Sequence, residues 1–191
     1  MKTKTVIASA ALLLAATANA STVDFLNAGT GVNDGVDYVG PYVLSVDGIT
    51  TAGTCITFDQ RVGPPYEWLA AIETVADFSE PVRTELLEAE WLNTQFAGSP
   101  DTVGIHHGIW DIFGASYADG EPWAALASAN YGTVDQNSFD VLAPTQANFT
   151  QTFLIPAKKP EEFTFTPEPG TSFLLGAGLV VLARMRRVSQ L

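Results

Sequence analysis

The hydrophobic pattern of the chain begins with short β-rich runs. Two of them, residues 42–46 and the residues from Ile49 onward, flank Asp47-Gly48. This dipeptide favours a type I′ turn, in which both central residues take positive φ, and it predicts a two-residue β-hairpin. The second strand of the hairpin is expected to continue through residues 53–59. Another strand is predicted at residues 66–75, after a Pro-Pro turn.

Helical periodicity replaces this pattern in the middle of the chain. A first helix is expected between a cap at Ser79 and a stop at Gly98. A second helix opens at Ser99-Pro100-Asp101, and it carries isoleucines at helical spacing together with three glycines that disfavour a helix interior. A third, short helix is predicted from Glu121 toward Gly132.

Strand patterns return at residues 138–142 and 148–155. Strands on both sides of a helical segment predict an α+β fold: an antiparallel β-sandwich or barrel with an insert of two or three helices. The globular domain is expected to span residues 21–155.

The N-terminus carries the three parts of a signal peptide within residues 1–20. Two lysines precede an apolar run at residues 6–16, and a small-x-small site predicts cleavage between Ala20 and Ser21. The apolar run is too short to span a bilayer, which takes about 20 residues. We therefore expect the Sec translocon and signal peptidase as partners and export of the domain.

The C-terminus has a tripartite pattern of its own. An expected extended linker at residues 156–166 is followed by Pro167-Glu168-Pro169, and an uncharged apolar run occupies residues 171–183. Three arginines in the basic tail, residues 184–191, are expected to stay in the cytoplasm and fix the topology: Arg184, Arg186 and Arg187. The apolar run predicts a short transmembrane helix that halts export of the chain.

This C-terminal pattern resembles the PEP-CTERM sorting domain of Gram-negative bacteria that make exopolysaccharide. The resemblance implies that residues 167–191 are a sorting signal, with Pro167, Glu168 and Pro169 recognised by the membrane protease-transpeptidase exosortase. It further implies that the tail is removed near the motif, so that membrane attachment is transient. An ordinary tail anchor after a proline-rich linker is the alternative.

The charge of the chain excludes one class of partner. Its formal net charge is −12, and residues 21–166 hold 20 acidic side chains against four basic ones. Such a surface repels phosphate backbones, so we expect no binding to nucleic acid. A single cysteine, Cys55, cannot form a disulfide within the chain.

The body of the chain carries motifs that resemble those of many PEP-CTERM proteins. In chain order they are Gly40-Pro41-Tyr42, Cys55-Ile56-Thr57-Phe58-Asp59, Glu88-Ala89-Glu90-Trp91-Leu92 and Ile105-His106-His107-Gly108-Ile109-Trp110. The arrangement is also similar to the thioester domains of Gram-positive adhesins, where a cysteine and a helical glutamine form an internal thioester. Here His106 stands at the position of the glutamine, and imidazole has no acyl carbon. The resemblance therefore implies the fold without the thioester.

Other chemistry can be drawn from the same residues. Cys55 and His106 are candidates for a thiolate–imidazolium pair, with Asp59 or Asp111 as the orienting carboxylate. A metal site at His106, His107 and Asp111 is disfavoured because adjacent helical side chains point about 100° apart. We expect no metal and no cofactor.

Two further patterns have a functional and a structural interpretation. Residues 33–37 resemble a fragment of a calcium loop, but a simple turn is favoured because the bidentate glutamate of an EF-hand is missing. The chain has four tryptophans that could form a sugar-binding face: Trp68, Trp91, Trp110 and Trp123. Three of them lie within apolar helical patterns, so core packing is favoured.

Taken together, these patterns predict an exported, exosortase-processed surface or extracellular-matrix protein. We expect it to be non-catalytic and associated with exopolysaccharide or biofilm. The alternative is a secreted adhesin or enzyme that uses Cys55 as a reactive nucleophile or thioester.

Overall fold

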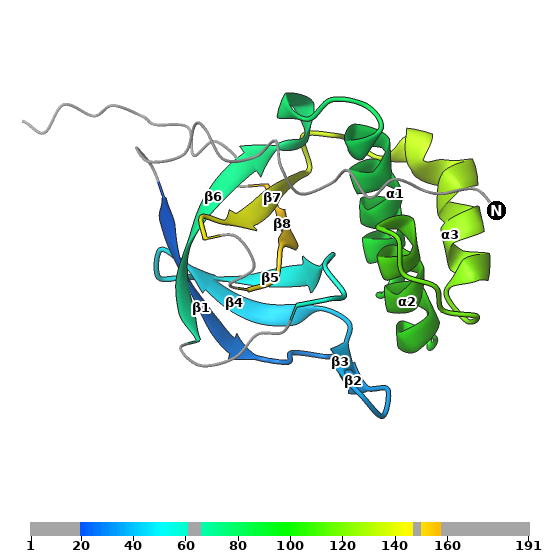
Figure 1. Cartoon of the computed structure of the whole chain (residues 1–191), viewed down its shortest axis with the longest axis horizontal. Coiled ribbons are helices and arrows are strands. Elements are labelled where there is room, and N and C mark those ends of the chain that lie inside the picture. Colours follow the sequence, from blue (N-terminus) through cyan, green and yellow to red (C-terminus); the bar gives the residue numbers. More distant parts are fainter. Residues whose placement is uncertain (1–19, 61–65, 147–149, 158–191) are drawn as a thin grey trace, which may run out of the picture. The chain divides into compact units, whose positions relative to one another are not determined.

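The computed structural model describes residues 20–60, 66–146 and 150–157 (Figure 1). The chain divides into two compact units, residues 1–158 and 159–191, and every described residue belongs to the first. The expected signal helix, most of the linker and the whole sorting signal lie outside the described residues.

An antiparallel β-barrel forms the centre of the described domain. Its strands close in the order β1-β4-β5-β8-β7-β6. They are β1 (Ser21–Asn27), β4 (Tyr42–Val46), β5 (Ile49–Cys55), β6 (Glu67–Thr74), β7 (Phe139–Pro144) and β8 (Phe153–Pro156). A small hairpin of β2 (Val32–Asn33) and β3 (Tyr38–Val39) lies between β1 and β4 in the chain. The α+β class is confirmed, and the barrel is formed rather than the sandwich.

Three α-helices form the insert between β6 and β7. They are α1 (Val82–Gln95), α2 (Thr102–Ile112) and α3 (Glu121–Asn130), with 3-10 turns η1 (Val75–Asp77) and η2 (Tyr131–Thr133) on either side. The helices pack on one another beside β5, β7 and β8 (Figure 1). Within the described part of the chain, no helix is long and apolar enough to cross a membrane.

The strands beside the helices are buried on both faces. On the paired strands β7 and β8, Leu142 and Phe153 oppose each other and point into the barrel. Their neighbours Val141 and Leu154 also oppose each other and pack against the helices. Alternation of side chains along a strand thus divides the apolar residues between two cores, one inside the barrel and one under the helices.

The predicted hairpin is present between β4 and β5. Val46 pairs with Ile49 across the turn. Asp47 and Gly48 have φ values of 52° and 79°, as the type I′ turn requires.

Several predicted boundaries were wrong. β5 ends at Cys55 instead of continuing to Asp59, which is exposed, because the chain turns away after Ile56 donates its N–H to Thr152. The start of α1 is not capped by Ser79, since Pro81 occupies the N-cap position and the Glu80 side chain accepts the N–H of Thr84 at 3.2 Å.

The ends of the domain also differ from the predictions. β8 begins at Phe153 and includes Pro156, which was assigned to the linker. β1 was not predicted at all. It begins at the residue after the expected signal cleavage site, and its alternation of side chains can be recognised only once its partners β4 and β6 are known.

The glycines of α2 are explained by close packing rather than by a break in the helix. A Cβ at Gly108 would come within 2.7 Å of the Cβ of Trp123 on α3. A Cβ at Gly104 would collide with the carboxylate of Asp101, which caps α2 by accepting the Gly104 N–H. Each glycine lowers the stability of the helix by about 1 kcal/mol relative to alanine. The close packing of α2 on α3 and the Asp101 cap offset this loss.

Replacing Leu44 with alanine tests the barrel core. Leu44 is fully buried inside the barrel, so Leu44→Ala should lower the free energy of unfolding by about 2–5 kcal/mol through lost burial and a cavity. Urea denaturation of the full chain measures the change. Leu69, 51% exposed on β6, is the matched control, and Leu69→Ala should stay within about 0.5 kcal/mol of the wild type. Equal effects of the two variants would contradict the assigned interior.

Candidate functional site

His106 on α2 joins two segments of the barrel that are far apart in the sequence. Its Nδ1 accepts the backbone N–H of Gly40 at 2.5 Å, and its Nε2 lies 3.0 Å from the backbone carbonyl oxygen of Cys55. Only the tautomer with its proton on Nε2 satisfies both contacts, so the ring accepts from Gly40 and donates to Cys55. Burial lowers the pKa of His106 to about 3, so the ring is neutral at pH 7.

Gly40 has a backbone conformation that suits this contact. Its φ is 113°, a value that residues with a side chain rarely take. A Cβ there would lie 3.0 Å from Cγ2 of Thr102, at the start of α2. Glycine therefore allows the backbone to approach the helix closely enough to reach His106.

The Cys55 thiol is fully buried at the end of β5. It donates to the carbonyl oxygen of Thr57 at 3.0 Å. Burial raises the pKa of the thiol to about 12, and contacts with Thr57 and the indole of Trp110 act in the opposite direction without overcoming it. A protonated, enclosed thiol is a poor nucleophile.

The expected pair of Cys55 and His106 is thus brought together, but through the backbone of Cys55. Both ring nitrogens of His106 are taken by backbone groups, which leaves neither as a base for the thiol. Of the two carboxylates considered as orienting groups, Asp59 is exposed, and Asp111 accepts the backbone N–H of Tyr117 at 2.8 Å. The geometry assigns His106 a structural role.

A second polar network lies between α1 and β5, beside Cys55. Thr54 donates to Asn93 at 2.6 Å, and Asn93 donates to a carboxylate oxygen of Glu90 at 3.0 Å. Glu90 is 9% exposed, and burial raises its pKa to about 7, which the Asn93 hydrogen bond offsets only in part. The sequence motif that contains Glu90 had suggested only a helix.

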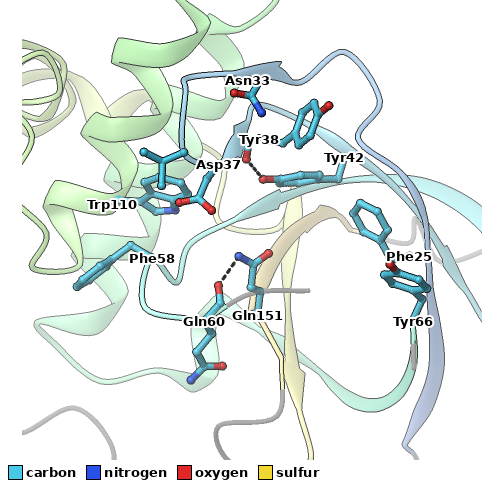
Figure 2. Close-up of a pocket in the computed structure, with 11 residues that line it drawn as sticks. Phe25, Asn33, Asp37, Tyr38, Tyr42, Phe58, Gln60, Tyr66, Trp110 and Gln151 are labelled. Carbon is cyan, nitrogen blue, oxygen red and sulfur yellow. Dashed lines mark hydrogen bonds between the residues drawn. The ribbon is translucent and has the colours of Figure 1, made fainter. Parts of the chain in front are cut away.

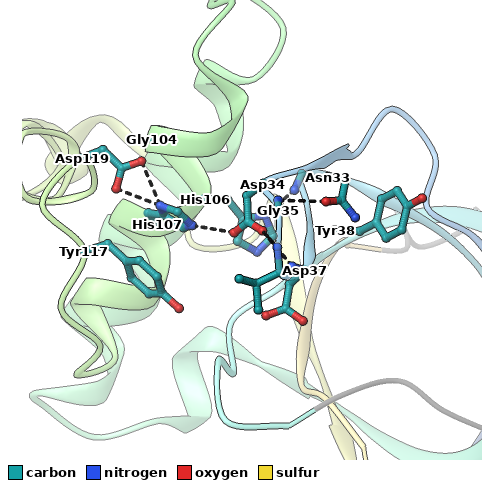
Figure 3. Close-up of polar contacts among 12 residues, drawn as sticks. Asn33, Asp34, Gly35, Asp37, Tyr38, Gly104, His106, His107, Tyr117 and Asp119 are labelled. Carbon is teal, nitrogen blue, oxygen red and sulfur yellow. Dashed lines mark hydrogen bonds and ion pairs between the residues drawn. The ribbon is translucent and has the colours of Figure 1, made fainter.

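His107 connects the β2–β3 hairpin to the loop before α3 (Figure 3). Its Nδ1 lies 2.8 Å from a carboxylate oxygen of Asp119, and its Nε2 lies 3.1 Å from one of Asp34. Only a doubly protonated ring donates to both carboxylates. The ring of Tyr117 stacks on the imidazole, with the ring centroids 4.0 Å apart.

Asp34 closes the turn that resembled a calcium loop. One oxygen of its carboxylate accepts the N–H groups of Val36 and Asp37, each at 2.7 Å, and the other faces His107. Burial acts to raise the pKa of Asp34, but these hydrogen bonds and His107 hold it below its usual value. Among the described residues, no group of three or more His, Cys, Asp or Glu side chains could hold a metal ion.

A cleft of about 300 Å³ opens at one end of the barrel (Figure 2). Its inner part is formed by side chains that are almost fully buried, namely Tyr42, Trp110 and Gln151. Its outer part includes exposed side chains of the β2–β3 hairpin and of the segments next to β5 and β6. The remaining lining residues are Phe25, Asn33, Val36, Asp37, Tyr38, Phe58, Gln60 and Tyr66.

Hydrogen bonds hold the parts of this cleft in place. The Tyr42 hydroxyl donates to the backbone oxygen of Tyr38, which ties the hairpin to the barrel. Gln151 donates to the backbone oxygen of Gln60 at 2.6 Å, which ties the segment after β5 to the one before β8 (Figure 2). The cleft is therefore built from parts of the chain that are far apart in the sequence, and no local sequence signal joined them.

The four tryptophans do not share a face. Trp68 is buried inside the barrel, and Trp91 and Trp123 pack against the core under the helices. Trp110 is 2% exposed at the inner end of the cleft. The preference for core packing is confirmed for Trp68 and Trp110.

The other predicted site residues are placed only in part. Ser21 is the first residue of β1, directly after Ala20. The sorting motif at residues 167–169 and the three arginines lie outside the described residues.

Comparison with known proteins gives no relative. No protein-family model, no curated protein and no solved structure matches the chain.

The reactivity of Cys55 can be measured directly. In the folded chain the thiol should react with iodoacetamide far more slowly than in the chain unfolded by guanidinium, because the folded thiol is enclosed and protonated. Intact mass should show no loss of ammonia and no change with methylamine. Rapid alkylation of the folded chain at mildly acidic pH, or discharge by methylamine, would show that Cys55 is reactive.

Glu90 should make the folded domain less stable as the pH rises. The pKa of Glu90 is raised in the folded state. Its contribution to the free energy of unfolding is therefore present below about pH 4.5 and is lost as the pH rises toward about 7. Glu90→Gln mimics the neutral acid, so this variant should match the wild type at pH 4 and exceed its unfolding free energy by about 1–3 kcal/mol at pH 8.

Urea denaturation between pH 4 and pH 8 measures this difference. Glu67→Gln, on an exposed position of β6, controls for the loss of one negative charge. A Glu90→Gln curve parallel to the wild-type curve at every pH would refute the shift.

Proposed function

We propose that the chain is an exported, non-catalytic surface or extracellular-matrix protein of a Gram-negative bacterium, processed by exosortase and associated with exopolysaccharide. The observation that carries the proposal is the C-terminal series of Pro167-Glu168-Pro169, an uncharged apolar run and three arginines. A signal peptide at the other end of the same chain supports it, because the sorting signal acts on a chain that has already been exported.

The limits of the folded domain support this division of the chain. β1 begins at Ser21, so cleavage after Ala20 would leave every strand of the barrel intact. β8 ends at Pro156, and the division into compact units falls between Lys158 and Lys159. Removal of the tail near residue 167 would likewise remove no part of the barrel.

The length of the apolar run supports a temporary anchor. Residues 171–183 would form a helix of about 20 Å, whereas the hydrocarbon core of a bilayer is roughly 30 Å thick. Such a helix needs local thinning of the bilayer or snorkelling arginines. It suits a segment that is held only until exosortase cuts it.

The surroundings of Cys55 favour a non-catalytic protein over the alternative of a covalent adhesin or enzyme. The thiol is enclosed and protonated, and His106 has no nitrogen to offer it. The acidic surface of the domain is compatible with an extracellular location and disfavours nucleic acid as a partner.

Replacing Glu168 tests the sorting proposal. In the native host, Glu168→Ala should leave the tail uncut and the protein in the membrane fraction, because the central residue of the recognised motif is lost. Intact mass and fractionation measure the outcome. Glu161→Ala is the matched control, since it removes the same side chain from the expected linker, and it should be processed normally.

Normal processing of Glu168→Ala would overturn the exosortase assignment. Retention of both variants in the membrane would do the same, because the motif would then have no special role and an ordinary tail anchor would account for the segment.

A further inference from the structure

The exposed aromatic side chains of the described domain lie around the cleft at the end of the barrel. Among the described residues, three aromatic side chains are at least 41% exposed: Tyr38, Phe58 and Tyr66. All three line the cleft, and so does Val36, which is 74% exposed. Scattered exposed apolar residues are ordinary, but aromatic side chains that gather around one cleft mark a binding surface.

The cleft also brings polar side chains to these rings, Gln151 from its inner part and three others from its outer part. Gln151, Asn33, Gln60 and Asp37 bring side-chain amides and a carboxylate to the lining. Gln151 is 8% exposed and is held by its bond to the Gln60 backbone, so its position does not depend on a ligand. Aromatic surface with a few fixed polar groups is the usual composition of a small-molecule site, and the mouth of a β-barrel is a common place for one.

Charge narrows the class of ligand. Asp37 is the charged residue among the described lining residues, and Asp34 lies beside it in the same hairpin. No lysine or arginine is found among the lining residues that the structure describes. The negative charge of these described residues repels a phosphate, sulfate or uronate, has little effect on a neutral ligand and attracts an amino-bearing one.

The barrel disfavours an extended peptide. Peptides bound by strand addition pair with an edge strand of a sheet, and no barrel strand is an edge strand in the closed order β1-β4-β5-β8-β7-β6. The edge strands of the described residues are β2 and β3, and each has only two residues. The cleft of about 300 Å³ lies at the small end of the usual range for ligand sites, about 300–1,000 Å³. Its size suits one or two rings of a small ligand.

We propose that this cleft binds a neutral or amino-bearing saccharide, whose pyranose rings stack on Tyr38, Phe58 and Tyr66 and whose hydroxyls meet the amides of Gln151 and Asn33. One face of a pyranose ring is apolar and its edge carries hydroxyl groups that donate and accept, which matches a lining of aromatic rings and side-chain amides. That the saccharide is extracellular rests on the proposed function, whereas the binding itself does not.

Binding can be measured on the full-length chain in a detergent without a sugar head group. The probes are oligomers of β-1,4-glucose, β-1,3-glucose and mannose, a chitosan oligomer, an oligogalacturonate and a proline-rich peptide. Saturation-transfer NMR should show transfer from aromatic protein protons to at least one neutral or amino-bearing oligomer, and titration calorimetry gives its Kd. The oligogalacturonate and the peptide should not bind.

Variants at the exposed rings locate the site. Tyr38→Ala and Tyr66→Ala should each raise the Kd by about tenfold or more, because each removes a stacking surface. Both side chains are about half exposed, so the melting temperatures should stay close to that of the wild type. Leu69→Ala is the matched control, since Leu69 is equally exposed at 51% but lies outside the cleft, and it should leave the Kd unchanged.

The proposal is overturned if no saccharide binds, if only the uronate or the peptide binds, or if the two tyrosine variants bind as tightly as the control. These outcomes are separate from the sorting test. A chain that is cut normally but binds no saccharide would lose this inference and keep its sorting role. A chain that binds saccharide but is not cut would do the reverse.

Discussion

The two backbone hydrogen bonds of His106 are the constraint on which the described domain depends. They join α2 to Gly40 before β4 and to Cys55 at the end of β5. A buried N–H or C=O that loses its partner costs about 1–3 kcal/mol, so this contact holds the helical insert against the barrel at one specific place. The Gly-Pro-Tyr, cysteine and α2 motifs, separate in the sequence, meet at this ring.

The segments that resemble a thioester domain are connected here without thioester chemistry. The side chain of α2 that faces the end of β5 is the imidazole of His106, and it connects the helices with the barrel. Here the imidazole makes that connection through backbone atoms, and the Cys55 thiol is left enclosed next to Thr57. Glu90 and Asn93 make a second connection between α1 and β5, through Thr54.

The same helix also shapes the open end of the barrel. His107, one position after His106, faces about 100° away from it and holds the β2–β3 hairpin through Asp34. Trp110, one turn further along, forms part of the inner cleft. The hairpin carries Tyr38, whose backbone oxygen accepts from Tyr42. One helix therefore fixes both the closed, unreactive surroundings of Cys55 and the position of the aromatic cleft.

The sequence alone predicted the order of the helices and of the strands from β4 onward, because turn chemistry and side-chain period are local properties, but it did not predict β1, β2 or β3. Asp47-Gly48 predicted its hairpin, and the helical insert between strands was legible from spacing. The two sorting segments stay predictions, and each rests on a contiguous pattern. Tertiary structure alone decided that the strands close into a barrel, that His106 bonds to backbone rather than to the Cys55 thiol, and that Tyr38, Phe58 and Tyr66 meet at one cleft. These depend on contacts between distant segments, and no periodicity within one segment encodes which distant residue it will face.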